Sequence, residues 1–488
     1  MFILMAVSLY TSRVILRVLG VEDFGIYNVV GGVISMMGVV NTAMSVSAQR
    51  YLTFELGKND FKRLKQVFSI CVTIYFLLSL LFLVLAETVG LWFLNNKLII
   101  PDNRIVTANW VYQFSIFAAI FALMTNPYNA VIISREKMGV YAYLSILESV
   151  MKLTVVFLLL AISYDRLKTY GALMLMVQIL ISAFYIIFCN INYKESVYKF
   201  YWERSLFSKL VAYTGWNLFG AFSGVAKGQG LNILLNMFFN PAVNAARGLA
   251  YQVNGAISHF FTNFYIAVRP QITKYYAQGD RDNMLKLVFR SSKMSFFLIL
   301  LVALPIMIEA PYIIQLWLGQ TPDYVIPFMR VIIVISAIDA MAQPLMTTAH
   351  ATGRIALYQS VVGTMTMLNI PISYVFLSLG YGPIVVFRIS LVISLVNLFL
   401  RLWIVNRLVD FPVSDYIMNV FAKCFLIAVL SSVAPLLIHG LTQQSTMTFI
   451  MVVLFSLLSA TTSIWLIGLT ASERTHLLMF AKNKINRK

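Results

Sequence analysis

The sequence predicts an all-helical integral membrane protein with about 14 transmembrane helices. Hydrophobic residues make up 60% of the 488 positions and charged residues only 11%, whereas about a quarter of the residues in a globular domain are charged. The apolar residues also form long continuous runs instead of alternating with period two. Such runs are typical of membrane helices and argue against an outer-membrane barrel.

Fourteen apolar runs follow one another along the chain, each about long enough to cross a bilayer as a helix that rises 1.5 Å per residue. The predicted spans are residues 1–19, 26–48, 67–94, 106–133, 140–163, 170–190, 210–237, 247–268, 294–317, 326–350, 356–379, 383–406, 419–440 and 447–470. Because their number is even, both ends of the chain should lie on the same side of the membrane.

The basic residues predict which side that is. The second loop, every second loop after it and the C-terminal tail hold 24 Lys and Arg residues, against 7 in the other loops. Cytoplasmic loops carry such an excess, so we expect both termini in the cytoplasm. The net charge of +18 then reflects membrane topology, and we expect no nucleic-acid partner.

An internal repeat predicts how the spans are grouped. The segment Arg50–Phe68 resembles Arg269–Phe289, and the stretch from Glu87 to Trp92 is echoed from Glu309 to Trp317. We therefore expect two six-helix bundles of like orientation, followed by an appendage. The predicted parts are an N-terminal bundle over 1–209, its repeat over 210–406, and two extra helices with a basic tail over 407–488.

Two motifs near the N-terminus carry a resemblance to a known family. They read Leu19-Gly20-Val-Glu-Asp-Phe24-Gly25-Ile-Tyr27-Asn28 and Ser47-Ala-Gln49-Arg50-Tyr51. The chain resembles the polysaccharide-transporter branch of the multidrug/oligosaccharidyl-lipid/polysaccharide (MOP) superfamily, which contains the Wzx-type O-antigen and capsule-repeat flippases. The resemblance covers essentially the whole chain.

That resemblance implies a MATE-like fold and a role in polysaccharide and lipopolysaccharide biosynthesis. The protein would flip an undecaprenyl-diphosphate-linked oligosaccharide from the cytoplasmic to the outer leaflet of the bacterial inner membrane, by alternating access. Membrane lipids and glycan polymerase or assembly proteins are the expected partners. Family members carry a basic segment before the first helix, whereas Met1 opens directly into apolar sequence. We therefore expect the true start to lie upstream.

Lys227 is the leading candidate for a functional residue. It falls inside the predicted span 210–237, where a buried ammonium is costly unless it faces water, a partner or an anionic ligand. Gly220, Gly224 and Gly228 recur every four residues and predict close packing of another helix on that face. We expect this helix to border a wet cavity. Snorkelling of Lys227, or its pairing with a carboxylate, is the alternative.

Other cations in the spans can also compensate the charge of a sugar diphosphate, because charge-assisted bonds to phosphate are strong. These candidates are Arg13, Arg17, Lys152 and Arg247. For the three arginines, anchoring at the membrane interface is an equally open interpretation, since they lie near span ends. Glu148 precedes Lys152 by four residues, which predicts an ion pair that neutralises both.

Polar residues spaced along three spans predict the lining of a sugar path. They are Asn41, Ser45 and Gln49 on the second span, Gln229, Asn232 and Asn236 on the seventh, and His259 and Asn263 on the eighth. Hydrogen bonds between helices, worth about 0.6 kcal/mol each in a membrane, explain the same pattern. Both interpretations stay open at this point.

Acidic residues inside spans are candidates for binding a coupling Na⁺ or H⁺. Asp339 is the best of them, because Gln343 lies one turn later and Pro344 frees a backbone carbonyl. Glu148 is a second candidate, whereas Glu87 and Glu309 lie nearer span ends and suit a structural role. Prolines inside spans predict bend points for moving bundles, at Pro127, Pro305, Pro344 and Pro371.

The sequence contains no sign of enzyme chemistry. The four histidines and three cysteines lack metal-ligand spacing, and no Gly-x-x-x-x-Gly-Lys-Ser/Thr loop is present for ATP. We therefore expect no catalytic residue, metal or cofactor, apart from a coupling ion.

Two other functions remain open. A MATE-type cation-coupled drug antiporter would share the fold, but its cavity should favour acidic and aromatic residues over Lys and Arg. A membrane enzyme that polymerises or ligates glycans would usually carry a large periplasmic loop. The longest predicted non-cytoplasmic loops here are only about ten residues long.

Overall fold

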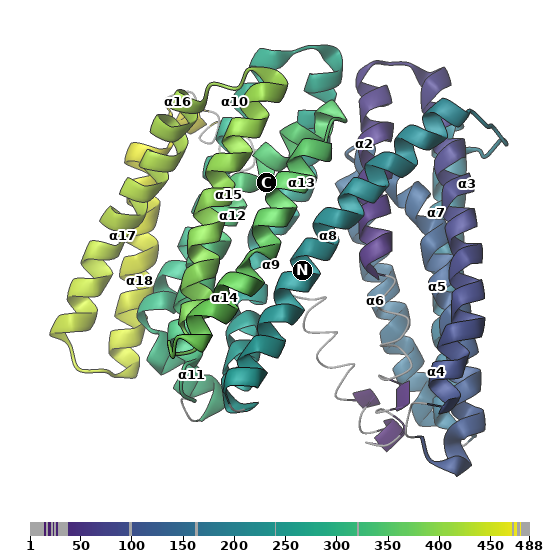
Figure 1. The fold of residues 1–488 in the computed structure, drawn as a ribbon, viewed down its shortest axis with the longest axis horizontal. Coiled ribbons are helices and arrows are strands. Elements are labelled where there is room, and N and C mark those ends of the chain that lie inside the picture. Colours follow the sequence, from purple (N-terminus) through teal and green to yellow (C-terminus); the bar gives the residue numbers. More distant parts are fainter. Residues whose placement is uncertain are drawn as a thin grey trace. The chain divides into compact units, whose positions relative to one another are not determined.

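The computed structural model describes residues 14–15, 18–20, 23, 26–27, 38–96, 100–161, 164–239, 241–319, 322–470, 473–475 and 479. All secondary-structure elements in these ranges are helical. The chain divides into two compact units, and the boundary between Leu218 and Phe219 falls within one long helix, α8 (Arg204–Phe238). Figure 1 shows that the long helices of each unit run roughly side by side.

Unit 1 is organised around α5, which packs against α7, α2 and α3. Its helices are α2 (Gly38–Gly57), α3 (Phe61–Leu85), α4 (Leu91–Asn96), α5 (Ile105–Ser134), α6 (Met138–Ala161), α7 (Arg166–Asn192) and the first half of α8. A π-helical turn, η1 (Ala86–Gly90), joins α3 to α4. Phe68, Tyr75 and Tyr112 are completely buried in the core of this unit.

Unit 2 is organised around α12, which packs against α9, α10 and α15. Its helices are α9 (Pro241–Gln278), α10 (Arg281–Ile308), α11 (Ala310–Leu318), α12 (Val325–Thr352), α13 (Ala356–Met367), α14 (Asn369–Ser378), α15 (Val385–Val409), α16 (Val413–Tyr416), α17 (Ala422–Leu441) and α18 (Thr446–Ser463), with the second half of α8. The π-helical turns η4 (Ile417–Phe421) and η5 (Ile464–Gly468) precede α17 and follow α18.

Ten of the predicted spans are confirmed as helices that are long and apolar enough to cross a membrane, within the described part of the chain. They correspond to the third to sixth and the ninth to fourteenth spans. The predicted bounds of the ninth span, 294–317, are wrong, because its helix runs over Arg281–Ile308 and a separate short helix, α11, follows Glu309. The helices α8 and α9 occupy the predicted seventh and eighth spans but are not among the ten. Both are interrupted by Lys, Arg, Asn and Gln residues, so their polarity sets them apart. Residues 1–13 lie outside the described residues.

The two repeated segments form the same turn in each unit. Asn59 and Gly279 adopt left-handed backbone conformations with φ of 56° and 73°, which end the preceding helix. Asp60 and Asp280 then cap the next helix, accepting hydrogen bonds from backbone N–H groups three residues on, at 2.9 and 3.2 Å. Counted from these caps, buried Val288 is equivalent to Phe68 and not to Val67, so the sequence pairing slips by one residue there.

Close packing of another helix was predicted at Gly220, Gly224 and Gly228 of α8, and this prediction is wrong at Gly224 and Gly228. A Cβ on Gly220 would lie 2.0 Å from Gln359 Oε1, and one on Gly230 would lie 2.6 Å from Ile370 Cδ1, so α13 and α14 approach α8 there. At Gly224 and Gly228 a Cβ would meet nothing within 4 Å. Glycines four residues apart lie on one face of a helix, but the close approaches to α8 are at Gly220 and Gly230, ten residues apart, because two different helices make them.

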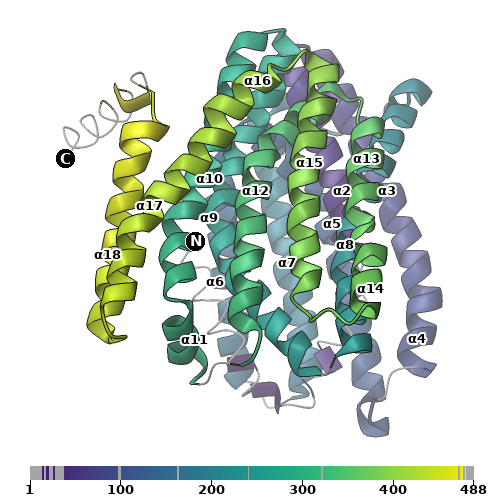
Figure 2. The same cartoon turned by 60° about the vertical axis from the view of Figure 1, so that its left-hand side comes forward.

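The last two long helices carry an apolar outer surface. Figure 2 shows α17 and α18 side by side at one edge of unit 2, and the two helices pack against each other. Large apolar side chains on them are exposed, among them Phe425, Leu437 and Leu458. Surfaces of this kind face lipid in a membrane protein, which explains how such exposure is tolerated.

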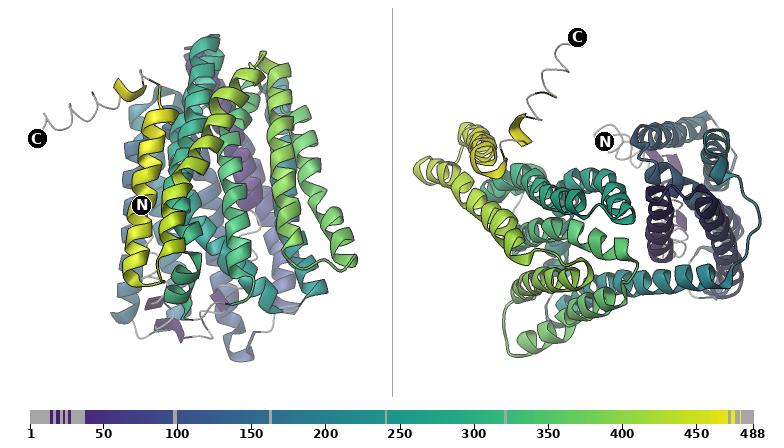
Figure 3. Two further views of the ribbon diagram at one scale, coloured as in Figure 1. Left: turned by 90° about the vertical axis from the view of Figure 1, so that its left-hand side faces the viewer. Right: turned by 90° about the horizontal axis from the view of Figure 1, so that it is seen from above.

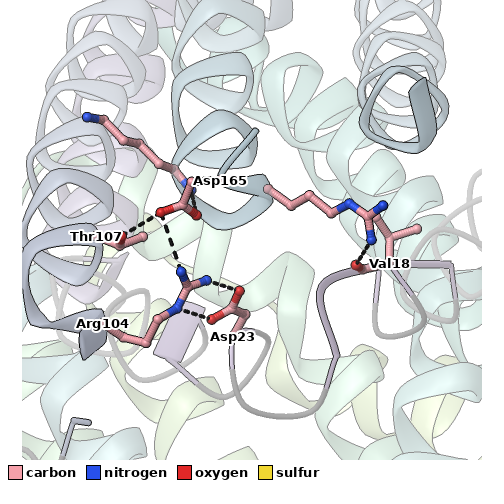
Figure 4. Close-up of polar contacts among 7 residues, drawn as sticks. Val18, Asp23, Arg104, Thr107 and Asp165 are labelled. Carbon is pink, nitrogen blue, oxygen red and sulfur yellow. Dashed lines mark hydrogen bonds and ion pairs between the residues drawn. The ribbon is translucent and has the colours of Figure 1, made fainter. Parts of the chain in front are cut away.

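A charged network holds the N-terminal motif and two loops of unit 1 together (Figure 4). Arg104 donates to both carboxylate oxygens of Asp23, with Nε to Oδ1 at 2.8 Å, and lies 3.4 Å from Asp165. Asp165 also accepts a bond from the Thr107 hydroxyl at 2.6 Å. Burial raises the pKa of Asp165, but the bond from Thr107, a backbone bond and the Arg104 charge outweigh burial and lower it. Asp23, inside the family-like motif, is thus an anchor of this loop cluster.

Candidate functional site

Charged residues from α8, α12 and α15 form a cluster in unit 2. Arg401 Nη1 on α15 lies 3.6 Å from Asp339 Oδ1 on α12, and Ser394 donates its hydroxyl to the same oxygen at 2.9 Å. Lys227 on α8 interacts electrostatically with both Asp339 and Arg401. The Lys227 side chain is only half-buried. The surroundings of Lys227 thus contain one acid, Asp339, and a second cation, Arg401.

Arg401 is held by a polar face of α15. Ser390, Ser394, Asn397 and Arg401 recur at helical spacing, and the first three are almost completely buried. Ser390 and Asn397 bond to residues of α14 and α13, with Asn369 Nδ2 to Ser390 Oγ at 2.8 Å. These bonds fix the rotation of α15 and direct Arg401 toward α12.

Two tyrosines line the same cluster. Tyr358 on α13 is 2% exposed, and its ring hydroxyl interacts electrostatically with Arg401. Tyr251 on α9 interacts with both Asp339 and Arg247. Tyr251 therefore connects the Asp339 centre to a second arginine.

Arg247 is turned toward α8. Its Nη2 donates to the Gly228 carbonyl at 2.7 Å and its Nη1 to Asn232 Oδ1 at 3.3 Å. The guanidinium carbon lies 4.9 Å from the centre of the Tyr251 ring, a cation–π distance. Arg247 is thus tied to the seventh predicted span, one helical turn beyond Lys227.

Cations exceed acids in this cluster. In the described part of unit 2, Lys227 and Arg401 interact with the single carboxylate of the cluster, Asp339, and Arg247 is linked to it through Tyr251. Arg269 adds a fourth cation nearby, since both it and Arg401 act on Tyr265. Among the described residues, the Nε atoms of Arg247 and Arg401 are buried without a hydrogen-bond partner. Spare donors beside an excess of positive charge are what an anionic ligand would satisfy.

The geometry bears on the ion-binding prediction for Asp339. Its charge is already compensated by Arg401, and two carbonyls of the same stretch of α12 are occupied by tyrosines. Tyr416 donates to the Met341 carbonyl at 2.9 Å and Tyr265 to the Gln343 carbonyl at 2.8 Å. Cation binding at Asp339 would therefore require Arg401 to move away first.

Several predicted residues lie elsewhere. Lys152 Nζ and Glu148 Oε1 form the ion pair that their spacing predicts, at 2.5 Å, on α6 of unit 1. Arg13 and Arg17 lie outside the described residues, and so does the side chain of His259. Glu309 is fully buried and paired with His439 at 2.8 Å, and Glu87 accepts a bond from Gln113 at 3.1 Å.

The polar stripes divide into two kinds. Asn41 accepts a hydrogen bond from Asn126 on α5, and Gln49 donates to Ser45 within α2 at 3.2 Å, so these residues bond inside unit 1. Gln229 and Asn236 on α8 and Asn263 on α9 are exposed in unit 2. The second group is the better placed to face water.

Two charged residues that are buried or nearly so, Arg401 and Arg50, are not among the predicted site residues. Arg401 falls inside the predicted span 383–406 but is not among the predicted cavity cations, although the polar residues at helical spacing before it are a signal in the sequence. Arg50, predicted in a loop, lies within α2 and is 8% exposed. It lies over Tyr51, Phe54 and Tyr213, with centroid distances of 4.5 to 5.8 Å. The predicted second span therefore ends too early, at residue 48, whereas α2 continues to Gly57.

Comparison with known proteins supports the fold. The chain matches the outward-facing structure of a multidrug resistance MATE family transporter of the MOP superfamily, with a TM-score of 0.70, 13% identity, and coverage of 84% of this chain and 94% of that one. It matches a MATE structure in the straight conformation with a TM-score of 0.71, 13% identity, and coverage of 85% and 93%. The fold is that of MOP-superfamily transporters.

A third match is a MOP superfamily transporter from Pyrococcus furiosus, for which reverse polarity of the binding pocket suggests a different function. Its TM-score is 0.69 at 13% identity, and the match covers 85% of this chain and 94% of that one. No protein-family model and no curated protein matches the sequence. The MATE-like helical fold is thereby confirmed, whereas the count of 14 spans and the two six-helix bundles stay predictions.

Proposed function

We propose that this protein is a multi-pass membrane transporter that flips an undecaprenyl-diphosphate-linked oligosaccharide from the cytoplasmic to the outer leaflet. The observation that carries the proposal is the excess of cations over acids around Asp339 in unit 2. The fold of MOP-superfamily transporters and the family-like motifs of the sequence support it.

The chemistry of the cluster suits a diphosphate. A sugar diphosphate carries about two negative charges and many acceptor oxygens, which need donors in a partly desolvated site. The unpartnered Nε groups of Arg247 and Arg401 and the ammonium of Lys227 offer such donors. Exposed polar residues on α8 and α9, such as Gln229, Asn236 and Asn263, would contact the hydroxyls of the sugars.

Asp339 would then act as the counter-charge of the empty state. When a diphosphate binds, it competes with Asp339 for Arg401. The released carboxylate becomes free to take up a proton or Na⁺, which would couple the substrate to an ion gradient. The bacterial inner membrane, cytoplasmic termini and glycan polymerase partners belong to the same proposal.

A MATE-type cation-coupled drug antiporter is the second candidate, because the solved structures of similar fold include MATE transporters. A cationic drug would need an acidic site. Asp339 is the single acid of the described cluster, and Arg401 lies 3.6 Å from it. The charge balance therefore favours an anionic substrate.

The decisive experiment measures the leaflet distribution of the lipid-linked oligosaccharide in cells depleted of this protein and complemented with variants. We expect Lys227→Ala and Arg401→Met to lower export at least tenfold, about 1.4 kcal/mol for each tenfold loss, and Arg401→Lys to retain part of it. Lys199→Met is the matched control, because Lys199 is exposed outside the predicted spans.

Each variant must first be shown to insert and fold, by membrane yield and gel filtration. An unchanged leaflet distribution after depletion would rule out the flippase for that glycan. Dye efflux that fails with Asp339→Asn and persists with Lys227→Ala would favour the antiporter.

A further inference from the structure

A second basic cavity lies in unit 2, apart from the Asp339 cluster. It has a volume of about 760 Å³ and is bounded by the first half of α10, the segment from Pro412 to Lys423, and residues that follow η5. Its lining is Asn283, Leu285, Lys286, Phe289, Arg290, Lys293, Pro412, Asn419, Lys423, Thr470 and Glu473. Figure 3 shows α17 and α18 side by side in unit 2.

One side of this cavity is a cationic face of α10. Lys286, Arg290 and Lys293 follow one another at spacings of four and three residues, so they share a face. Lys423 adds a fourth cation from α17. Glu473 is the single acid among the residues that line the cavity, so its formal charge is +3.

Glu473 is engaged with one corner of the cavity. It accepts a bond from the buried Lys293 ammonium at 3.1 Å and lies 3.9 Å from Arg290 Nε. It also forms a capping box with Thr470, accepting from the Thr470 N–H at 2.9 Å. Burial raises the pKa of Glu473, but the Thr470 bond and the Lys293 charge outweigh it and lower that pKa. This carboxylate is therefore ionised and occupied.

Lys286 and Lys423 form no ion pair with any acid of the described residues. Among these residues, Lys423 Nζ bonds only to the neutral Asn419 Oδ1, at 3.1 Å. Lys286 is exposed to the cavity and forms no hydrogen bond or ion pair with any other described residue. Asn283 and Asn419 supply amide groups at the same wall. Two uncompensated ammonium groups and neutral amides make a receptor for a compact anion.

The position of the cavity points to the membrane interface. The apolar helices that contribute to it begin at Arg281 and Val413. The helix α10 has 28 residues and is about 42 Å long at 1.5 Å per residue, whereas the hydrocarbon core of a bilayer is about 30 Å thick. Its charged first turns, which include Lys286, are therefore expected to reach into the headgroup region. Leu285 and Phe289 give part of the wall an apolar surface. Basic pockets between membrane helices bind acidic headgroups by such a combination.

We propose that this cavity binds a phosphate group through Lys286 and Lys423, carried either by an anionic phospholipid or by a soluble phosphate. The buried Lys293–Glu473 pair fixes Glu473 in the wall of the site. The proposal is independent of the transported substrate, because it involves none of the residues of the Asp339 cluster.

The test uses the full-length protein, purified and placed in nanodiscs of phosphatidylcholine. Thermal unfolding and lipid retention by native mass spectrometry are measured after addition of phosphatidylglycerol, or of inorganic phosphate in a parallel arm. The double variant Lys286→Met/Lys423→Met leaves the Lys293–Glu473 pair intact. Its matched control is Lys62→Met/Lys199→Met, which removes two exposed lysines of unit 1.

We expect phosphatidylglycerol to bind the wild type and the control with similar affinity, and the double variant roughly tenfold to thirtyfold more weakly, since each lysine near an acidic headgroup adds to the affinity. Lys423→Arg should bind as the wild type does. Protection by millimolar inorganic phosphate alone, lost in the double variant, would identify a soluble phosphate as the source. Equal binding by wild type and double variant, or equal loss in the control, would overturn the proposal.

Discussion

At the scale of single residues, charge inside the bundle matters more than hydropathy. Lys227 interrupts an apolar run and could be identified from the sequence for that reason, whereas Arg401 follows a row of buried polar side chains on its helix. The structure brings the two together around Asp339. An intramembrane charge is costly to bury, and a shared carboxylate lowers that cost for both cations without cancelling their excess.

Close packing at this scale can be tested on α8. Gly230 approaches Ile370, whereas Gly224 has open space around it. Gly230→Val should therefore destabilise the protein by roughly 1–3 kcal/mol through overpacking. Gly224→Val, the same change on the same helix, should have little effect.

Thermal unfolding in detergent, followed by gel filtration at increasing temperature, measures the difference. If the two variants unfold at the same temperature, Ile370 does not limit the approach of α14 to α8.

At the scale of elements, the polar helices α8 and α9 contribute Lys227 and Arg247 to the candidate site, and the apolar helices α12 and α15 contribute Asp339 and Arg401. The helices α8 and α9 fall outside the ten apolar helices because their sequences give up hydropathy for Asn, Gln, Lys and Arg. Apolar helices such as α17 and α18 instead present side chains to lipid. The charged cluster and the most apolar outer surface thus involve different helices, since α17 and α18 contribute no residue to the cluster.

The segment that leads into α8 is held by an ion pair that predicts a pH dependence. Arg63 Nη1 and Nη2 donate to Glu203 at 2.6 and 3.0 Å, and Tyr201 donates to it at 2.8 Å. The bonds from Arg63 and Tyr201 lower the pKa of Glu203 from its ordinary value of 4.5 to about 2. A lowered pKa contributes stability above about pH 4.5, and this contribution is lost as the pH falls toward 2.

Glu203→Gln should accordingly unfold at a lower temperature than the wild type at pH 7, with the difference shrinking between pH 4.5 and pH 3. Asp323→Asn is the control, because Asp323 is an exposed carboxylate that bonds to no other described residue. A difference between wild type and Glu203→Gln that stays constant over this pH range would mean that the ion pair does not contribute.

At the scale of the whole molecule, two units share one local design. A residue with left-handed backbone conformation and an aspartate cap precede both α3 and α10. The proposed binding site for the anionic substrate, in contrast, lies in unit 2. Basic residues concentrate in alternate loops of both units, which predicts the orientation of the whole chain in the membrane.

That orientation can be tested by cysteine labelling. Cys71, Cys189 and Cys424 are buried, so introduced cysteines can be detected above them. In intact cells, an impermeant maleimide should label Asp102→Cys, which is predicted to lie outside. Lys199→Cys should react only after permeabilisation, because its loop is predicted to be cytoplasmic. The reverse pattern would invert the topology and place both termini outside.

The helical membrane fold could be predicted from the sequence because long apolar runs have no other stable arrangement in lipid. The Lys152–Glu148 pair could likewise be predicted, since it depends on residues close together in the chain. Lys227 and Asp339 were identifiable as unusual for the same reason, by their position inside single spans. The caps at Asp60 and Asp280 were not predicted, although they lie within the repeated segments.

Only the tertiary structure decided how those residues meet. Arg401 lies 3.6 Å from Asp339 although the two are far apart in the chain, and Arg247 turns back onto the Gly228 carbonyl. It also decided which glycines are in close contact, and that four cations and one acid line a cavity beside α10. Hydropathy reports what one helix prefers, whereas charge pairing depends on how helices rotate and cross, which no single span encodes.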